Sequence, residues 1–280
     1  MQELDRKELP IVFIKPSRSW VLPQLRHVWA YRELLYFLVW RDLKVRYKQT
    51  VLGALWAIIK PFSMMVIFSI FFGKLAKIPS EGIPYPIFTY AALLPWSYFA
   101  QSLSACSNSL VGNSHLITKV YFPRLIIPIS SLMSGLVDFA ISFSILLAMM
   151  VYYQIIPTLL ALLLPLLILM AMATALGAGL WLSALNVQYR DIRFALSFLV
   201  QFWFFATPVV YPSSLVPERW QFLYGLNPMV GVVEGFRGAL LGKGQVIVSL
   251  FTVSLIVIAF LLITGTLYFR RMEKQFADVV

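Results

Sequence analysis

Charge is scarce in this chain: charged residues make up 12% of the 280 positions, whereas apolar residues make up 60%. A water-soluble globule with one core needs a larger polar surface than this composition provides. The balance excludes an ordinary soluble domain, and we expect the chain to be surrounded by lipid.

Cysteine and histidine are almost absent, which argues against several kinds of site. The single cysteine, Cys106, cannot form a disulfide within the chain, and we expect it to be a small packing residue. His27 and His115 stand in no pattern with Asp or Glu that suggests a metal site, so we expect no metal and a surface position for both. Residues 1–20 lack the apolar core of a cleavable signal peptide.

Long apolar stretches are what the chain has instead. A helix rises about 1.5 Å per residue, so roughly 20 apolar residues cross a hydrocarbon layer about 30 Å thick. Six stretches come near that length, at residues 51–72, 87–105, 126–152, 157–185, 194–211 and 246–269. The sequence therefore predicts an all-α membrane protein with six transmembrane helices.

Lys and Arg are distributed unevenly. Most of the 23 lie before the first span or in the connectors after the second, fourth and sixth spans. Because cationic connectors resist translocation, this asymmetry predicts that both termini lie in the cytoplasm. The net charge of +11 then reflects topology and headgroup contact rather than nucleic-acid binding.

The segment before the first span is amphipathic. Apolar residues recur at steps of three and four over residues 25–47, and the apolar run 34–40 is too short to cross a bilayer. We therefore predict a helix on the membrane surface, within a cytoplasmic N-terminus (1–50) that precedes the membrane domain (51–280). It is either a plain interfacial anchor or a surface covered by a partner subunit, because its middle is apolar on all sides.

Two cytoplasmic connectors, residues 107–124 and 186–193, combine aromatic and basic residues. Exposed aromatics with a polar rim suit anchors in a protein groove, but they equally suit anchors at lipid headgroups. The candidate contact residues are Lys119, Tyr121, Phe122, Arg124, Tyr189 and Arg190.

Seven short motifs are specific in combination, although each is weak alone. They are Tyr31-Arg-Glu-Leu-Leu35, Trp40-Arg-Asp-Leu-Lys-Val-Arg-Tyr-Lys48, Leu52-Gly-Ala-Leu-Trp56, Lys119-Val-Tyr-Phe-Pro-Arg124, Tyr189-Arg-Asp191, Thr207-Pro-Val-Val-Tyr-Pro212 and Leu226-Asn-Pro-Met229. From about residue 31 onward, the chain closely resembles the permease subunits of ABC-2 type exporters of lipid-linked polysaccharide, the group that exports O-antigen, capsule and teichoic acid.

The resemblance implies a homodimer in the bacterial inner membrane that carries two separate nucleotide-binding subunits, which hold ATP and Mg²⁺. It implies a coupling helix at about residues 108–122, and it adds Trp40 and Arg41 to the expected motor-docking surface. It also implies external gate helices at about residues 213–242. The residues we expect at this gate are Tyr211, Trp220, Tyr224, Asn227, Met229 and Phe236.

The chain itself shows no nucleotide-binding loop. A Walker A loop needs Gly-x-x-x-x-Gly-Lys followed by Ser or Thr, and residues 238–244 are one residue short and lack the hydroxyl. A membrane enzyme would need convergent acids and bases, but Asp138 is the only carboxylate in a predicted span. We therefore expect a transport subunit that is not an enzyme and has no cofactor of its own.

Few polar groups lie within the predicted spans. Lys60 precedes Pro61, which interrupts the first span; the Lys60 side chain either bridges to Asp138 or, as we favour, snorkels toward the cytoplasm. A polar stripe follows the third span at Ser130, Ser134, Asp138 and Ser142. This stripe, like the small residues 173–179 of the fourth span, is typical of close helix packing. It would also suit a hydrated wall, so Ser134 and Asp138 are candidate conduit residues.

An aromatic stripe follows the fifth span, and the further candidate conduit residues are Phe194, Phe198, Gln201, Phe202 and Phe205. Such stripes usually face lipid or neighbouring helices. Alternatively, rigid rings can contact the apolar faces of sugar rings without fixing a hydrogen-bond register, which suits a moving glycan.

Prolines interrupt the chain after the fifth span. Asn227-Pro228 predicts an N-cap followed by proline at the first helical position, in a helix that ends near Gly242. This helix is too short to cross the membrane and too apolar for a free loop. We predict a re-entrant external hairpin between the fifth and sixth transmembrane helices, with Glu234 and Arg237 as a local ion pair.

The predicted function is export of a lipid-linked polysaccharide across the inner membrane, driven by ATP hydrolysis in a separate subunit. Two alternatives are an ABC-2 type exporter of a drug or small lipid, and a passive channel or membrane scaffold.

Overall fold

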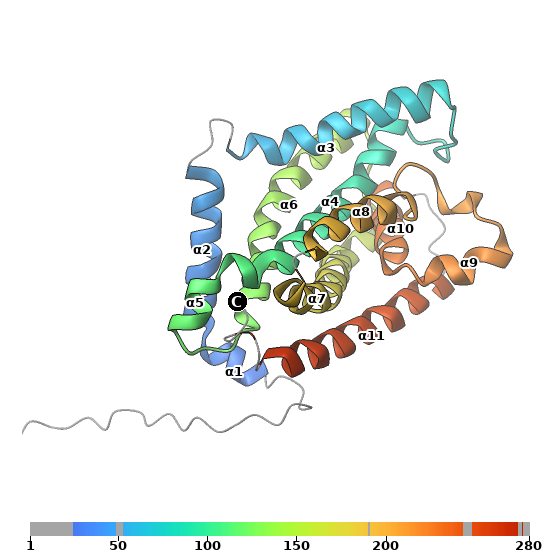
Figure 1. Cartoon of the computed structure of the whole chain (residues 1–280). Coiled ribbons are helices and arrows are strands. Elements are labelled where there is room, and N and C mark those ends of the chain that lie inside the picture. The colour runs from blue at the N-terminus through green and yellow to red at the C-terminus, as the bar shows by residue number, and fades with distance from the viewer. Residues whose placement is uncertain (1–24, 49–52, 190, 243–247, 274–275, 277–280) are drawn as a thin grey trace, which may run out of the picture.

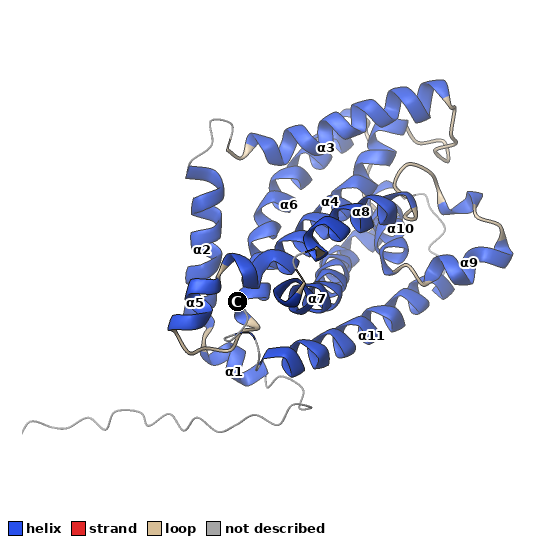
Figure 2. Ribbon diagram, in the orientation of Figure 1, coloured by secondary structure: helices blue, strands red, loops and turns tan. Residues whose placement is uncertain are grey.

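The computed structural model of this chain describes residues 25–48, 53–189, 191–242, 248–273 and 276. Every regular element in this part of the chain is a helix (Figure 2), which confirms the all-α prediction there. The helices are α1 (Leu25–Ala30), α2 (Arg32–Lys48), α3 (Leu55–Phe68) with its π-helical continuation η1 (Ser69–Leu75), α4 (Tyr85–Gly112), α5 (Ser114–Lys119), α6 (Ile126–Tyr152), η2 (Leu159–Leu163), α7 (Leu164–Gln188), α8 (Ile192–Phe205), η3 (Ser213–Leu215), α9 (Glu218–Gly225), α10 (Pro228–Leu241) and α11 (Val248–Met272).

Four helical stretches among the described residues are long and apolar enough to cross a membrane. They are Leu55–Leu75, Ile126–Tyr152, Leu159–Gln188 and Leu250–Met272. They correspond to the first, third, fourth and sixth predicted spans, so hydropathy located these four correctly.

The second predicted span lies inside α4, which has 28 residues but is not among the four apolar stretches. Helix α4 carries Ser, Thr, Asn and Gln side chains and packs against α3, α6, α7, α8 and α10. Because protein covers most of α4, this helix does not need the apolar surface that a lipid-facing helix requires.

The fifth predicted span, residues 194–211, is helical only as far as Phe205. Helix α8 has 14 residues, and at about 1.5 Å per residue it is roughly 21 Å long. The chain beyond it contains Pro208 and Pro212 and is not helical. By length and composition, four helices of the described residues could cross a membrane, so the prediction of six transmembrane helices is confirmed only in part.

The ends of the helices define two ends of the molecule (Figure 1). Helix α2 runs crosswise to α3 and lies with α1, α5 and the last turns of α11 at one end, here called the α2/α5 end. Helix α9 and the connection from α3 to α4 lie at the opposite end, called the α9/α10 end.

Small residues allow α7 to pack closely against two neighbours, as the sequence predicts. A Cβ atom on Gly177 would lie 2.7 Å from the backbone of Leu261 in α11. A Cβ atom on Gly179 would lie 2.5 Å from the sulfur of Cys106 in α4. Cys106 is fully buried, so the prediction that it is a small packing residue is confirmed.

Candidate functional site

Three of the predicted docking aromatics are exposed at the α2/α5 end. Tyr121 is 65% exposed, and Trp40 and Tyr189 are about half exposed. The Lys44 ammonium lies 4.4 Å from the Trp40 ring centroid, and Lys119 is also exposed. The α2/α5 end thus offers the aromatic surface and basic rim that the sequence predicts.

Phe122 differs from its neighbour, and the expectation that it is exposed is wrong. Its ring is only 3% exposed and belongs to a buried apolar cluster that joins α2, α4, α5, α6, α7 and α11. The members of this cluster are Leu38, Leu110, Ile117, Phe122, Ile126, Ile127, Leu180, Ala184, Phe269 and Phe276. Phe122 therefore helps to hold the α2/α5 end together.

The basic docking candidates are partly engaged within the chain. The Arg41 guanidinium donates to the Asp42 carboxylate at 2.8 Å and to the Asn113 side-chain oxygen at 2.7 Å, which fastens α2 to the turn between α4 and α5. The Arg124 guanidinium donates to the Val120 carbonyl at 3.2 Å. Arg190 lies outside the described residues.

The conduit candidates fall into two places. Phe194, Phe198, Gln201, Phe202 and Phe205 are all exposed on α8, which packs against α4 and α7. Ser134 is buried in α6 and donates to the Ser131 carbonyl of its own helix at 2.9 Å. The described contacts of Ser134 therefore favour the packing interpretation over a hydrated wall.

Asp138 is held by the end of α2. Its two carboxylate oxygens accept hydrogen bonds from the Arg46 guanidinium and the Tyr47 hydroxyl. Burial and this bond to Asp138 raise the pKa of the Tyr47 phenol. The ion pair described for Asp138 is with Arg46 and not with Lys60, and the snorkelling of Lys60 toward the cytoplasm stays a prediction.

A cavity of about 500 Å³ lies beside this carboxylate. It is lined by Arg46, Tyr47, Gly53, Trp56, Ala57, Lys60, Gln101 and Asp138. Its walls come from α2, α3, α4 and α6, so four helices meet around a space that they do not fill.

At the α9/α10 end, Asn227 caps α10 as predicted. Its side-chain oxygen accepts from the Met229 backbone N–H at 3.0 Å and from the Trp203 ring N–H at 2.8 Å. Its amide nitrogen donates to the Thr207 hydroxyl at 2.9 Å. Gly242 ends the helix with φ of +68°, in the left-handed region that suits a helix C-terminus.

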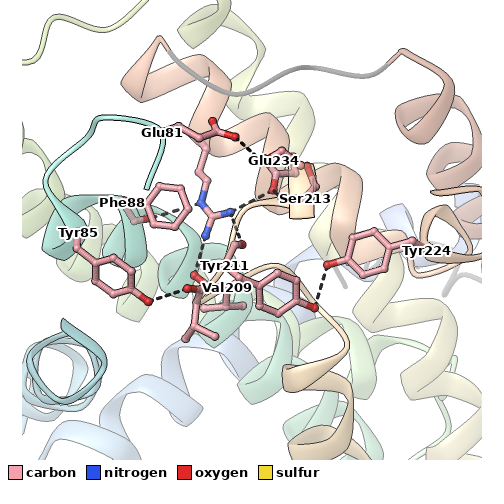
Figure 3. A network of polar contacts seen from close by, with 11 residues as sticks. Glu81, Tyr85, Phe88, Val209, Tyr211, Ser213, Tyr224 and Glu234 are labelled. Carbon is pink, nitrogen blue, oxygen red and sulfur yellow. Dashed lines mark hydrogen bonds and ion pairs between the residues drawn. The ribbon is translucent and has the colours of Figure 1, made fainter. Parts of the chain in front are cut away.

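The other predicted gate residues divide into buried and accessible ones. Met229 and Phe236 are fully buried, whereas Trp220 on α9 is half exposed. The Tyr224 hydroxyl donates to the Tyr211 hydroxyl at 3.1 Å, which links α9 to the segment after α8 (Figure 3).

Arg237 of α10 is the centre of a buried polar network (Figure 3). The predicted ion pair with Glu234 is present at 3.1 Å, but Arg237 is only 1% exposed. Its guanidinium also donates to the carbonyls of Val209 at 2.6 Å and Tyr211 at 3.2 Å, and lies 3.8 Å from the Phe88 ring centroid. Figure 3 shows that these partners converge from three separate segments onto one side chain.

Glu234 completes the network by accepting from the Ser213 backbone N–H at 3.1 Å. Burial raises the pKa of Glu234 and lowers that of Arg237, whereas their mutual attraction opposes both changes. Sequence reasoning identified the pair but missed its burial. The signal available was an ionisable pair within an otherwise apolar helix, which is costly unless both groups are bonded.

Comparison with known proteins gives a consistent result. The profile of the ABC-2 type transporter family matches residues 33–241. The O-antigen export system permease protein RfbA of Myxococcus xanthus is 30% identical over 263 residues, which cover 91% of this chain and 98% of that protein. An O-antigen export system permease protein RfbA of Klebsiella pneumoniae is 28% identical, over 89% of this chain and 95% of that protein. The polysialic acid transport protein KpsM of Escherichia coli is 27% identical, over 84% and 92% respectively.

Proposed function

Because this chain belongs to the ABC-2 type transporter family, we propose that it is the permease subunit of an exporter that moves a lipid-linked polysaccharide across the bacterial inner membrane. The observation that carries the proposal is the near full-length similarity to proteins named for O-antigen export and polysialic acid transport. Both cargoes are glycan polymers, which makes a glycan cargo more consistent than a drug.

The energy for export comes, in this proposal, from ATP hydrolysis in a separate nucleotide-binding subunit that docks at the α2/α5 end. The support is an accessible aromatic surface made by Trp40, Tyr121 and Tyr189, with Lys44 and Lys119 beside it. Aromatic side chains with a basic rim are suited to a protein groove. The chain itself acts as the transport component and leaves ATP and Mg²⁺ to the partner.

The proposed layout has six membrane crossings, with α4 and α8 added to the four apolar stretches, and two copies of the chain around the conduit. An even number of crossings agrees with the position of α2, α5 and the last turns of α11 at one end of the molecule (Figure 1), which would be the cytoplasmic end. Helices α9 and α10 would then form the re-entrant external hairpin. The exposed stripe of α8 is the face that a second copy, lipid or the glycan would cover.

Reconstitution with the cognate nucleotide-binding subunit tests this function. Vesicles that contain both chains should move lipid-linked glycan only when ATP is supplied, and the glycan should stimulate ATP hydrolysis. Glycan flux without the motor subunit would indicate a passive channel instead. Stimulation by small hydrophobic drugs, with none by glycan, would indicate a drug exporter.

A further inference from the structure

Two polar residues of α6, one helical turn apart, each reach a different neighbouring helix. Asp138 accepts hydrogen bonds from Arg46 and Tyr47 at the end of α2. Ser142 donates to the backbone carbonyl of Ala57 in α3 at 2.7 Å. One face of α6 therefore binds both the helix before the first span and the first span itself.

The Ser142 hydroxyl bonds to a carbonyl of α3 that lacks its usual backbone donor. In a regular helix, the Ala57 carbonyl accepts from the backbone N–H four residues later, but that position is Pro61, which has no N–H. An unpaired carbonyl within a membrane is costly. The Ser142 hydroxyl supplies a donor to this carbonyl at 2.7 Å and also lies 2.9 Å from the Asp138 carbonyl of its own helix, so the two carbonyls share its single proton.

The cavity beside Asp138 makes these bonds more important. Arg46, Tyr47, Ala57 and Asp138 all line its space of about 500 Å³, so close packing does not fix the end of α2 on that side. The polar contacts therefore help to position this end of α2, which also packs along α6. A carboxylate in a membrane span is also costly to keep unless it has such partners.

We propose that Asp138 and Ser142 form a coupling junction, in which Asp138 is the positioning residue that transmits movement of α2 to α6, and Ser142 extends that movement to α3. The inference rests on the proposed function, because a motor subunit docked at the α2/α5 end would be the source of the movement. In this proposal, Asp138 couples two helices and does not line the conduit. Lys60 faces the same cavity without being part of the junction.

Hydrogen exchange in the complex of this chain with its nucleotide-binding subunit tests the junction. A non-hydrolysable ATP analogue should change exchange in α2, α3 and α6 of the wild-type chain. Asp138→Asn should keep the change in α2 and reduce the change in α6 at least about fivefold, which is the lower end of usual coupling strengths. Ser142→Ala should reduce the change in α3 alone.

Ser130→Ala is the matched control, because Ser130 lies on the same stripe and, among the described residues, its hydroxyl bonds to the Ile127 carbonyl of its own helix, at 2.8 Å. This variant should behave as wild type. Exchanging the charges, with Arg46→Asp and Asp138→Arg together, should restore part of the α6 response that Asp138→Arg alone abolishes. An α6 response of wild-type size in Asp138→Asn, or none in the wild-type complex, would overturn the proposal.

A transport readout separates coupling from mere stabilisation. If Asp138 transmits movement, Asp138→Asn should raise the ATP consumed per glycan exported about fivefold. If it only stabilises the fold, the amount of folded protein falls and this ratio stays unchanged, which counts against the junction. Should the wild-type complex export no glycan while its α6 response still depends on Asp138, the junction would stand and the proposed cargo would fall.

Discussion

The two ends of the molecule are held in different ways. Helix α10 is buried along almost its whole length, and Arg237 bonds it to the Phe88 carbonyl of α4 and to the Val209 and Tyr211 carbonyls of the segment after α8. Helices α1 and α2 instead leave Trp29, Tyr36 and Trp40 exposed, and among the described contacts α2 is bound to the rest of the chain by hydrogen bonds of Arg41 to Asn113 and of Arg46 and Tyr47 to Asp138. Helix α10 is thus enclosed by the chain itself, although α9 beside it exposes Trp220 and Phe222, whereas α1 and α2 present an exposed aromatic surface for the proposed nucleotide-binding subunit.

Removing Arg237 should give the largest loss of stability. Arg237→Met leaves Glu234 as an uncompensated buried carboxylate, which costs about 3–5 kcal/mol. We expect a large fall in melting temperature in lipid nanodiscs. Arg219→Met, at an exposed position of α9, is the control and should melt like wild type. Adding Glu234→Leu to Arg237→Met should recover part of the loss. Equal melting temperatures of Arg237→Met and Arg219→Met would contradict a central role for the network.

Phe122 and Tyr121 should behave oppositely, although they are adjacent. Phe122→Ala removes a ring from the buried cluster and should cost about 3 kcal/mol. Tyr121→Ala removes an exposed ring and should change stability by less than about 0.5 kcal/mol. Only the Tyr121 variant, which stays folded, tests docking, and pull-down of the nucleotide-binding subunit should then be weaker. Undiminished pull-down would show that Tyr121 is not a docking residue.

Asn227 should have an intermediate effect at the α9/α10 end. Asn227→Ala removes the cap of α10 and the partner of Trp203, and the loss of an N-cap costs about 1 kcal/mol. Asn227→Asp keeps the acceptor for both N–H groups but loses the amide donors. We therefore expect its melting temperature to lie between those of wild type and the Ala variant. A fully stable Ala variant would mean that burial alone holds α10.

The smallest effect on stability is expected on α8, where the interest lies in transport. Phe198→Leu keeps the exposed surface apolar but removes the ring, so the melting temperature should not change. If the ring meets sugar faces, export should fall a few fold, because one aromatic contact is worth about 0.5–1.5 kcal/mol. Unchanged export would assign this position of the stripe to lipid or to the second copy.

Local signals in the sequence predicted several features of this fold. The apolar stretches located four spanning helices, and Asn227, Pro228 and Gly242 defined both ends of α10. Hydropathy could not describe α4, since its polar residues are tolerated only because other helices surround it. It also overestimated the length of the helix at α8, where Pro208 and Pro212 follow within one apolar stretch.

The candidate site was harder to predict because its key contacts join distant positions. Asp138 meets residues 92 and 91 positions earlier, and Arg237 meets carbonyls 28 and 26 positions earlier. Composition identified these charged residues as unusual but could not supply their partners. The burial of Phe122 beside an exposed Tyr121 likewise depends on how α5, α6 and α11 meet.

The most direct test of this account is which side of the membrane each end of the molecule faces. Tyr121→Cys and Trp220→Cys can be labelled with a membrane-impermeant maleimide in intact cells, and the buried Cys106 should give little background. In cells that lack the nucleotide-binding subunit, which would cover position 121, the account predicts labelling from outside at position 220, and at position 121 only after the inner membrane is permeabilised. Labelling of position 121 in intact cells would place the docking surface away from ATP and would contradict the account.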